Sequence, residues 1–232
     1  MTVDPRILTL PGSANVRDLG GLTGADGREV RRGRLLRSDY PGFAADPEAV
    51  RTIGLRTVVD LRGRAEAKVE SVDWDDHGVT YHRCPVSAGS ADSWHARYPA
   101  YLTHRPETVV AAVRHLMDAG AQPALFHCAA GKDRTGTIAA LLLGVLGVDD
   151  DQVVADYVLT EGAVEAILER LGGHELYRTM LADSSVDDQM PRAEHMQGLL
   201  DFLASQGGAA RWLVDHGVPS EEIETFRAEM LV

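Results

Sequence analysis

The sequence lacks any apolar run long enough to cross a bilayer as a helix, which takes about 18 residues or more. Its first residues include Asp4, Pro5 and Arg6 and have no apolar core, so we expect no secretory signal peptide. Only 2 of the 232 residues are cysteines, too few for a disulfide framework. These absences favour a reducing compartment, and we expect a cytoplasmic protein, with secretion by a leaderless route left open.

Basic residues are also scarce. The 23 Lys and Arg face 35 Asp and Glu, which gives a formal net charge of −12. Nucleic-acid binding depends on Lys and Arg that neutralise phosphates, so this balance argues against a nucleic-acid partner. The sequence shows no His, Cys, Asp and Glu cluster with the spacing of metal ligands. We therefore expect neither a metal nor another cofactor.

The length of 232 residues, without internal repeats or obvious linkers, predicts one domain over 1–232. Short β-branched or apolar runs predict strands at 33–36, 57–61, 79–85 and 123–127. Helical spacing and capping signals predict helices at 46–53, 106–119, 134–146, 150–159, 161–171, 174–181, 192–205, 208–215 and 220–230. Strands in the first half with helices throughout predict an α/β fold. We expect a small, mostly parallel central sheet flanked by helices, with a helical C-terminal half.

The most informative segment is His-Cys-Ala-Ala-Gly-Lys-Asp-Arg-Thr-Gly at 127–136, between a predicted strand and a predicted helix. A loop at a helix N-terminus points backbone N–H groups into a common space, where they and the helix dipole favour a phosphate dianion. Gly131 permits a tight turn that a Cβ could block. Arg134 follows Cys128 by six positions, enough to curl back and grip two phosphate oxygens.

Cys128 fits the role of a nucleophile in this loop. Thiolate is the nucleophilic form, and the donors that bind phosphate also stabilise it. Thr135 can hydrogen-bond the sulfur and help it leave in a second step. The residues expected around the phosphate are Ala129, Ala130, Gly131, Lys132, Thr135 and Gly136.

Three other interpretations of the segment fit less well. A lone cysteine at a strand end is most often a small buried hydrophobe. The string Gly-Lys-x-x-Thr suggests a nucleotide loop, but the Walker pattern needs a glycine where Phe126 stands. A zinc site is disfavoured because His127 and Cys128 are adjacent and point to opposite faces of a strand.

The segment resembles the signature loop of cysteine phosphatases. Its Gly-Lys-Asp-Arg-Thr-Gly form resembles the atypical bacterial protein-tyrosine phosphatases related to the mycobacterial tyrosine/lipid phosphatase B. Further segments similar to that family lie at 15–21, 36–38, 60–62, 155–157 and 217–218. The resemblance implies a tyrosine-phosphatase-like fold. It also implies metal-free hydrolysis of phosphotyrosine, often with activity toward phosphoserine, phosphothreonine or phosphoinositides.

The residue that protonates the leaving group stays open. In some relatives an Asp closely follows a Pro that ends the second strand, but Pro85 has no acid after it until Asp92. Asp133 is the first candidate, because it is the only carboxylate in the loop and a bound dianion should raise its pKa. Asp60, at the C-terminal end of a core strand, is the second, with an ion pair to Arg62 as its structural alternative. Asp92 is the third.

The sequence thus predicts a phosphomonoester hydrolase that acts through a phosphocysteine, above all a protein-tyrosine phosphatase with dual or phosphoinositide specificity left open. One alternative is a phosphatase of a small metabolite, such as a nucleoside, sugar or inositol phosphate. Another is a catalytically inactive phosphate-binding module. The expected partner is a phosphate monoester, either a phosphotyrosine protein or a small phosphorylated metabolite.

Overall fold

The computed structural model describes residues 4–91 and 93–232. Within them a single sheet has the strand order β1-β2-β5-β3-β4, and all its pairings are parallel except that of β1 with β2. The strands are β1 (Arg17–Asp18), β2 (Leu35–Ser38), β3 (Thr57–Asp60), β4 (Thr80–Arg83) and β5 (Ala124–His127). The predicted small, mostly parallel sheet is confirmed.

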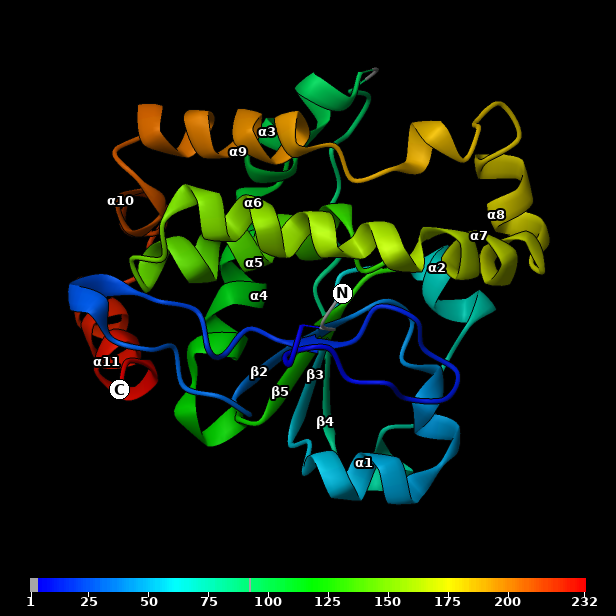
Figure 1. The fold of residues 1–232 in the computed structure, drawn as a ribbon, viewed down its shortest axis with the longest axis horizontal. Coiled ribbons are helices and arrows are strands. Elements are labelled where there is room, and N and C mark those ends of the chain that lie inside the picture. The colour runs from blue at the N-terminus through cyan, green and yellow to red at the C-terminus, as the bar shows by residue number, and fades with distance from the viewer. Residues whose placement is uncertain (1–3, 92) are drawn as a thin grey trace.

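Helices cover both faces of the sheet and dominate the second half of the chain, as predicted (Figure 1). No helix in the described ranges is both long and apolar enough to cross a membrane. The helices of the first half are α1 (Pro47–Ile53), α2 (Arg64–Val69), α3 (Trp94–Thr103) and α4 (Pro106–Met117). Those of the second half are α5 (Asp133–Val145), α6 (Asp150–Val158), α7 (Val164–Gly172), α8 (Glu175–Met180), α9 (Ala193–Ser205), α10 (Ala209–Asp215) and α11 (Ser220–Met230).

The two faces of the sheet bury separate apolar clusters. Along the central strand β5, Phe126 packs in a large cluster with α4 and α5, whereas Leu125 packs on the opposite face with Val50 of α1. This alternation follows from the two-residue period of a strand. Helix α5 is buried almost all round, from Thr135 to Leu143. The loop between β5 and α5 is therefore held between two buried elements.

The structure differs from the predicted elements in the first half of the chain. Strand β2 begins two residues after the predicted start, because Gly33 takes a left-handed conformation with φ +68° in the preceding turn. The two-residue strand β1 and the helices α2 and α3 were not predicted. Pro99 inside α3 masks its helical spacing, although Tyr98, Tyr101 and Leu102 all face the core.

Candidate active site

The candidate site begins where β5 ends. His127 is the last residue of β5 and Asp133 the first of α5, so Cys128 to Lys132 form a loop at the N-terminus of a helix. Gly131 has φ +65°, and a Cβ there would lie 2.5 Å from backbone atoms of Ser38 and Asp39. Only glycine fits this position, because the loop passes directly over the end of β2.

The carbonyl groups of the loop are held from outside. Asn15 donates from Nδ2 to the oxygen of Ala130 at 3.1 Å, and Arg37 donates from Nη2 to that of Gly131 at 2.8 Å. In a planar trans peptide the N–H points opposite to the C=O. The N–H groups that follow these carbonyls therefore face the inner side of the loop, which makes it a cradle for an anion.

A buried ion cluster supports this arrangement. Asp156 of α6 binds Arg6 at 2.8 Å, Arg17 at 3.1 Å and Arg37 at 2.6 Å. Burial raises the pKa of the Asp156 carboxyl, but the three guanidinium groups outweigh it and hold the pKa well below its usual range. The family-like segments around Arg17, Arg37 and Asp156 thus lie together, behind the phosphate loop.

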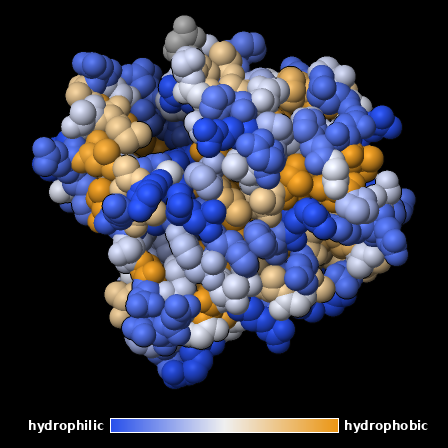
Figure 2. Space-filling model, turned by 180° about the vertical axis from the view of Figure 1, so that it is seen from behind, coloured by the Kyte–Doolittle hydropathy of each residue, from blue (hydrophilic) through white to orange (hydrophobic). Residues whose placement is uncertain are grey.

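Cys128 lies deep in a cleft of about 450 Å³. The hollow is visible at the upper left of Figure 2, with apolar residues along its outer side. The cleft is lined by the loop, by α2 and α3, and by α8 with the adjoining chain. Its charged and aromatic lining residues are Glu66, Trp94, Arg97, Tyr101, Asp133, Arg134 and Tyr177.

Asp133 lies in the cleft, and one of its two carboxylate oxygens is hydrogen-bonded to neighbouring side chains. Its Oδ1 accepts hydrogen bonds from the hydroxyl of Tyr98 at 2.6 Å and from Nζ of Lys132 at 2.9 Å. Burial raises the pKa of Asp133, but the Lys132 charge and these two bonds outweigh it, and the pKa lies below its usual range. The rise that we expected from a bound dianion is therefore opposed by these partners in the free site.

Asp60 is placed differently from Asp133. It is wholly buried, binds Arg62 at 2.8 Å and the hydroxyl of Tyr81 at 2.9 Å, and does not line the cleft. Although burial raises its pKa, His127 and the bonds from Arg62 bring the pKa to about 2. The ion-pair alternative for Asp60 and Arg62 is what the structure shows. Asp92, the third candidate, lies outside the described residues.

The other loop residues divide between the cleft and the core. Ala129 and Ala130 line the cleft together with Cys128 and Arg134. Lys132 does not, because its buried ammonium pairs with Asp133 and lies 4.5 Å from the ring centre of Trp94.

Thr135 and Gly136 are buried in the first turn of α5. The Thr135 hydroxyl is buried and has no hydrogen-bond partner among the described residues. Gly136 lies against Tyr157, where a Cβ would sit 3.2 Å from the ring. The structure therefore gives Gly136 a packing contact.

Two contacts of the site were missed by the sequence analysis. Glu66 of α2 binds Arg134, and Tyr98 of α3 binds Asp133. The helical spacing of Tyr98 with Tyr101 and Leu102 was a usable signal for a helix that faces the core. Nothing in the sequence near Glu66 indicates a partner 68 positions away.

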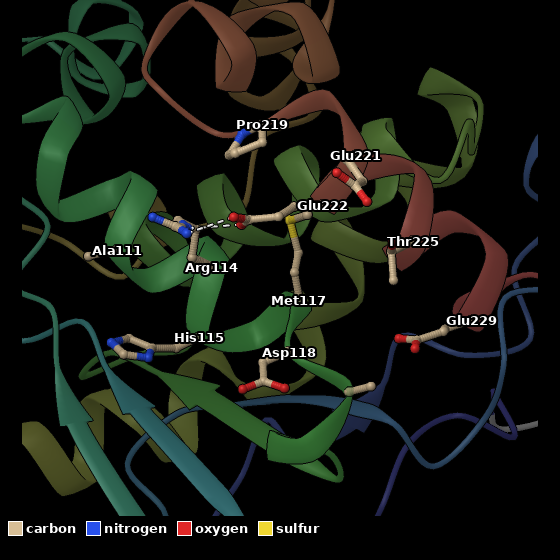
Figure 3. Close-up of a pocket in the computed structure, with 11 residues that line it drawn as sticks. Ala111, Arg114, His115, Met117, Asp118, Pro219, Glu221, Glu222, Thr225 and Glu229 are labelled. Atoms are coloured by element: carbon tan, nitrogen blue, oxygen red, sulfur yellow. Dashed lines mark hydrogen bonds and ion pairs between the residues drawn. The ribbon is translucent and has the colours of Figure 1, made fainter.

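A larger cavity of about 820 Å³ lies between α4 and α11, away from the loop (Figure 3). Its lining is acidic, with Asp118, Glu221, Glu222 and Glu229, and its one arginine, Arg114, is bound to Glu222. This charge disfavours a phosphate dianion, so the smaller cleft is the candidate active site.

Neither a metal cluster nor a disulfide marks the site. No group of three or more His, Cys, Asp or Glu in the described part of the chain is arranged to hold a metal ion. Cys84 and Cys128 are both free. They follow β4 and β5, which are separated by β3, so their Cα atoms lie roughly 9–10 Å apart at the usual strand spacing, beyond disulfide reach.

The chain is similar to known phosphatases. A family model described as "Tyrosine phosphatase family" matches residues 8–232. A candidate tyrosine-protein phosphatase of Cupriavidus necator is 40% identical over 166 residues. The match covers 62% of this chain and 59% of that protein, which is less than two thirds of the relative's length. The triple specificity protein phosphatase PtpB of Mycobacterium tuberculosis is 28% identical over 256 residues, covering 89% of this chain and 88% of that protein. The solved structure of P. aeruginosa TpbA in complex with phosphotyrosine has a TM-score of 0.43 and 20% identity, covering 67% of this chain and 80% of that one.

Proposed function

Because the chain belongs to the tyrosine phosphatase family, we propose that it is a cysteine-dependent phosphatase that hydrolyses phosphate monoesters through a phosphocysteine on Cys128. We propose phosphotyrosine proteins as its main substrates and residues 1–232 as one catalytic domain. The observation that carries the proposal is the position of Cys128 and Arg134 in one cleft, on a loop whose carbonyl groups are held outward. The names of the mycobacterial and Cupriavidus relatives support it.

In the first step the Cys128 thiolate attacks phosphorus in line with the ester oxygen. The S–P bond forms as the P–O bond to the leaving group breaks, and the leaving oxygen takes a proton from Asp133. Arg134 and the loop N–H groups hold the other three phosphate oxygens, whose charge is spread in the transition state.

In the second step water attacks the phosphocysteine. The carboxylate of Asp133 takes a proton from this water, the S–P bond breaks, and the sulfur leaves as thiolate. We propose that the buried hydroxyl of Thr135 donates to the sulfur at this point. Inorganic phosphate is released, and the enzyme returns to its starting protonation state.

The lining of the cleft favours an aryl phosphate over a polyphosphorylated ligand. Its walls include Trp94, Tyr101 and Tyr177, and its outer side carries Met180 and Leu181. Its lining contains two arginines and two carboxylates, so the cleft carries no surplus of positive charge for further phosphates. Aromatic walls suit the ring of phosphotyrosine. The intact Cys128 and Arg134 argue against an inactive module. Because the proposed chemistry needs a free thiol and both cysteines are free, we propose the cytoplasm as its compartment.

A panel of phosphate monoesters, assayed with and without EDTA, tests this proposal. We expect p-nitrophenyl phosphate and a phosphotyrosine peptide to be hydrolysed best, a phosphoserine peptide less well, and an inositol polyphosphate least. Activity is expected to survive chelation. A preference for a nucleoside or sugar phosphate would favour the metabolite alternative, whereas loss of activity with EDTA and rescue by a divalent ion would contradict the mechanism.

A further inference from the structure

Asp133 has two carboxylate oxygens, and the structure treats them differently. We propose that Tyr98 and Lys132 are positioning residues that pin Oδ1 of Asp133, so that Oδ2 is the oxygen that exchanges protons with the substrate and with water. This inference rests on the proposed function, because it concerns the acid and base of that reaction. It adds two residues that touch neither the phosphate nor the leaving group.

The hydrogen bonds of Asp133 carry the proposal. Oδ1 accepts from the Tyr98 hydroxyl at 2.6 Å and from Lys132 at 2.9 Å, whereas Oδ2 has no hydrogen bond to any described residue. Asp133 lines the cleft together with Cys128. Two donors on one oxygen fix the plane of the carboxylate, and the other oxygen is left for the reaction.

The second tyrosine fixes the direction of the bonds. Tyr157 of α6 lies 2.6 Å from the Tyr98 hydroxyl, and both tyrosines are fully buried. An ionised carboxylate only accepts, so Tyr98 must donate its one proton to Asp133 and accept from Tyr157. Burial and the charge of Asp133 raise the pKa values of both phenols, which keeps these protons in place. Tyr157 follows Asp156 in the chain, so neighbouring residues of α6 support the loop and the acid.

Lys132 is fixed by an aromatic wall. Its ammonium lies 4.5 Å from the ring centre of Trp94, and His195 of α9 stacks between Trp94 and Tyr98 at 5.6 Å and 5.9 Å. The lysine side chain is only 3% exposed. Lys132 therefore binds Asp133 from the side away from the cleft. Arg134 and the loop N–H groups remain to contact the phosphate.

This arrangement has a consequence for pH dependence. Tyr98 and Lys132 stabilise the ionised form of Asp133. They therefore favour its role as base in the second step and oppose the protonated form that it needs as acid in the first step. Removing either donor should raise the pKa of Asp133. The charged and titratable groups that act on Asp133 from the packed elements are Lys132, Arg134, Tyr98, Tyr101, Tyr157 and His195.

The test compares Tyr98→Phe and Lys132→Met with Tyr81→Phe. Tyr81 is a matched control, since it gives a 2.9 Å hydroxyl bond to the carboxylate of Asp60, outside the cleft. We expect both site variants to move the basic limb of the kcat/KM profile to higher pH. They should also slow a phosphoserine peptide by ~10-fold to 100-fold, with a smaller loss for p-nitrophenyl phosphate. The control should keep the wild-type profile.

The carboxyl pKa of Asp133, followed by ¹³C NMR in a Cys128→Ser background, gives a readout that is independent of turnover. It should rise in both site variants, and Lys132→Met keeps the test decisive if Tyr98→Phe fails to fold. An unchanged basic limb and carboxyl titration in the folded variants would overturn the proposal, as would a shift seen only in Tyr81→Phe. A phosphocysteine adduct in Tyr98→Phe and Lys132→Met with Cys128 intact would show that the proposed function stands even then.

Discussion

Arg134 and Glu66 form a bidentate ion pair across the cleft, with 2.7 Å from Nη1 to Oε2 and 2.7 Å from Nη2 to Oε1. Burial raises the pKa of Glu66, but its bonds to Arg134 outweigh this and keep the carboxylate ionised. The pair fixes the plane of the guanidinium but engages both of its terminal nitrogens. A phosphate must therefore approach Nε and share or displace Glu66 at one Nη.

Glu66→Gln should separate these two effects. The amide has one acceptor oxygen in place of two and no charge, so Arg134 becomes less ordered but more attractive to a dianion. We expect kcat to fall ~10-fold while inhibition by inorganic phosphate becomes tighter. Steady-state kinetics with phosphate as competitor measure both. If kcat and the inhibition constant for phosphate both stay at their wild-type values, the Arg134–Glu66 pair has no part in catalysis.

Arg134→Lys keeps the positive charge but loses the planar fork. We expect kcat to fall by ~10² or more, because the two-pronged contact tightens on the transition state. Arg114→Lys is the control, since Arg114 makes a similar bidentate pair with Glu222 in the other cavity (Figure 3). Equal kinetics for the two variants would contradict the role given to Arg134.

Asp133→Asn tests the proton donor. A protonated acid is needed to release a poor leaving group, so we expect a severe loss on alkyl phosphates and a much smaller loss on p-nitrophenyl phosphate. In the wild type, activity should fall as the pH rises through the pKa of Asp133, and this basic limb should vanish in the variant. An equal loss on both substrates with a lowered Tm would instead make Asp133 a structural residue. The same assays on Asp60→Asn and Asp92→Asn would then identify the donor.

Asp156→Asn should destabilise the fold as well as the loop. Removing one partner of a buried charge cluster costs about 3–5 kcal/mol, because Arg17 and Arg37 stay buried without their counter-ion. Asp215→Asn breaks the exposed pair with Arg211 and should cost about 1 kcal/mol or less. Urea unfolding measures both variants.

The pH dependence of stability gives a second measurement on Asp156. Its folded pKa is depressed, so its contribution is present above the unfolded pKa of about 4 and is lost as the pH falls below that value. The variant should therefore lose less stability on acidification than the wild type. Identical pH profiles for the two proteins would contradict an ionised Asp156 in the folded state.

Features of the site that depend on residues close together in the chain could be predicted from the sequence. The spacing of Cys128, Gly131 and Arg134 lies within one short segment, so the strand–loop–helix context around them was predictable. The partners of the site were not, because Glu66, Tyr98 and the loop come from separate helices that only the fold brings together. The family-like segments at Arg17, Arg37 and Asp156 were visible, but their shared purpose needed the structure.

The phosphocysteine itself gives the most direct test. Wild-type enzyme is mixed with a phosphotyrosine peptide and quenched in acid within its first turnover, and the peptides are then analysed by mass spectrometry. We predict one phosphoryl group on the peptide that contains Cys128, none on the same peptide of Cys128→Ser, and no turnover by that variant. Retained turnover by Cys128→Ser, or rapid wild-type turnover with no phosphoryl group on Cys128, would contradict the mechanism.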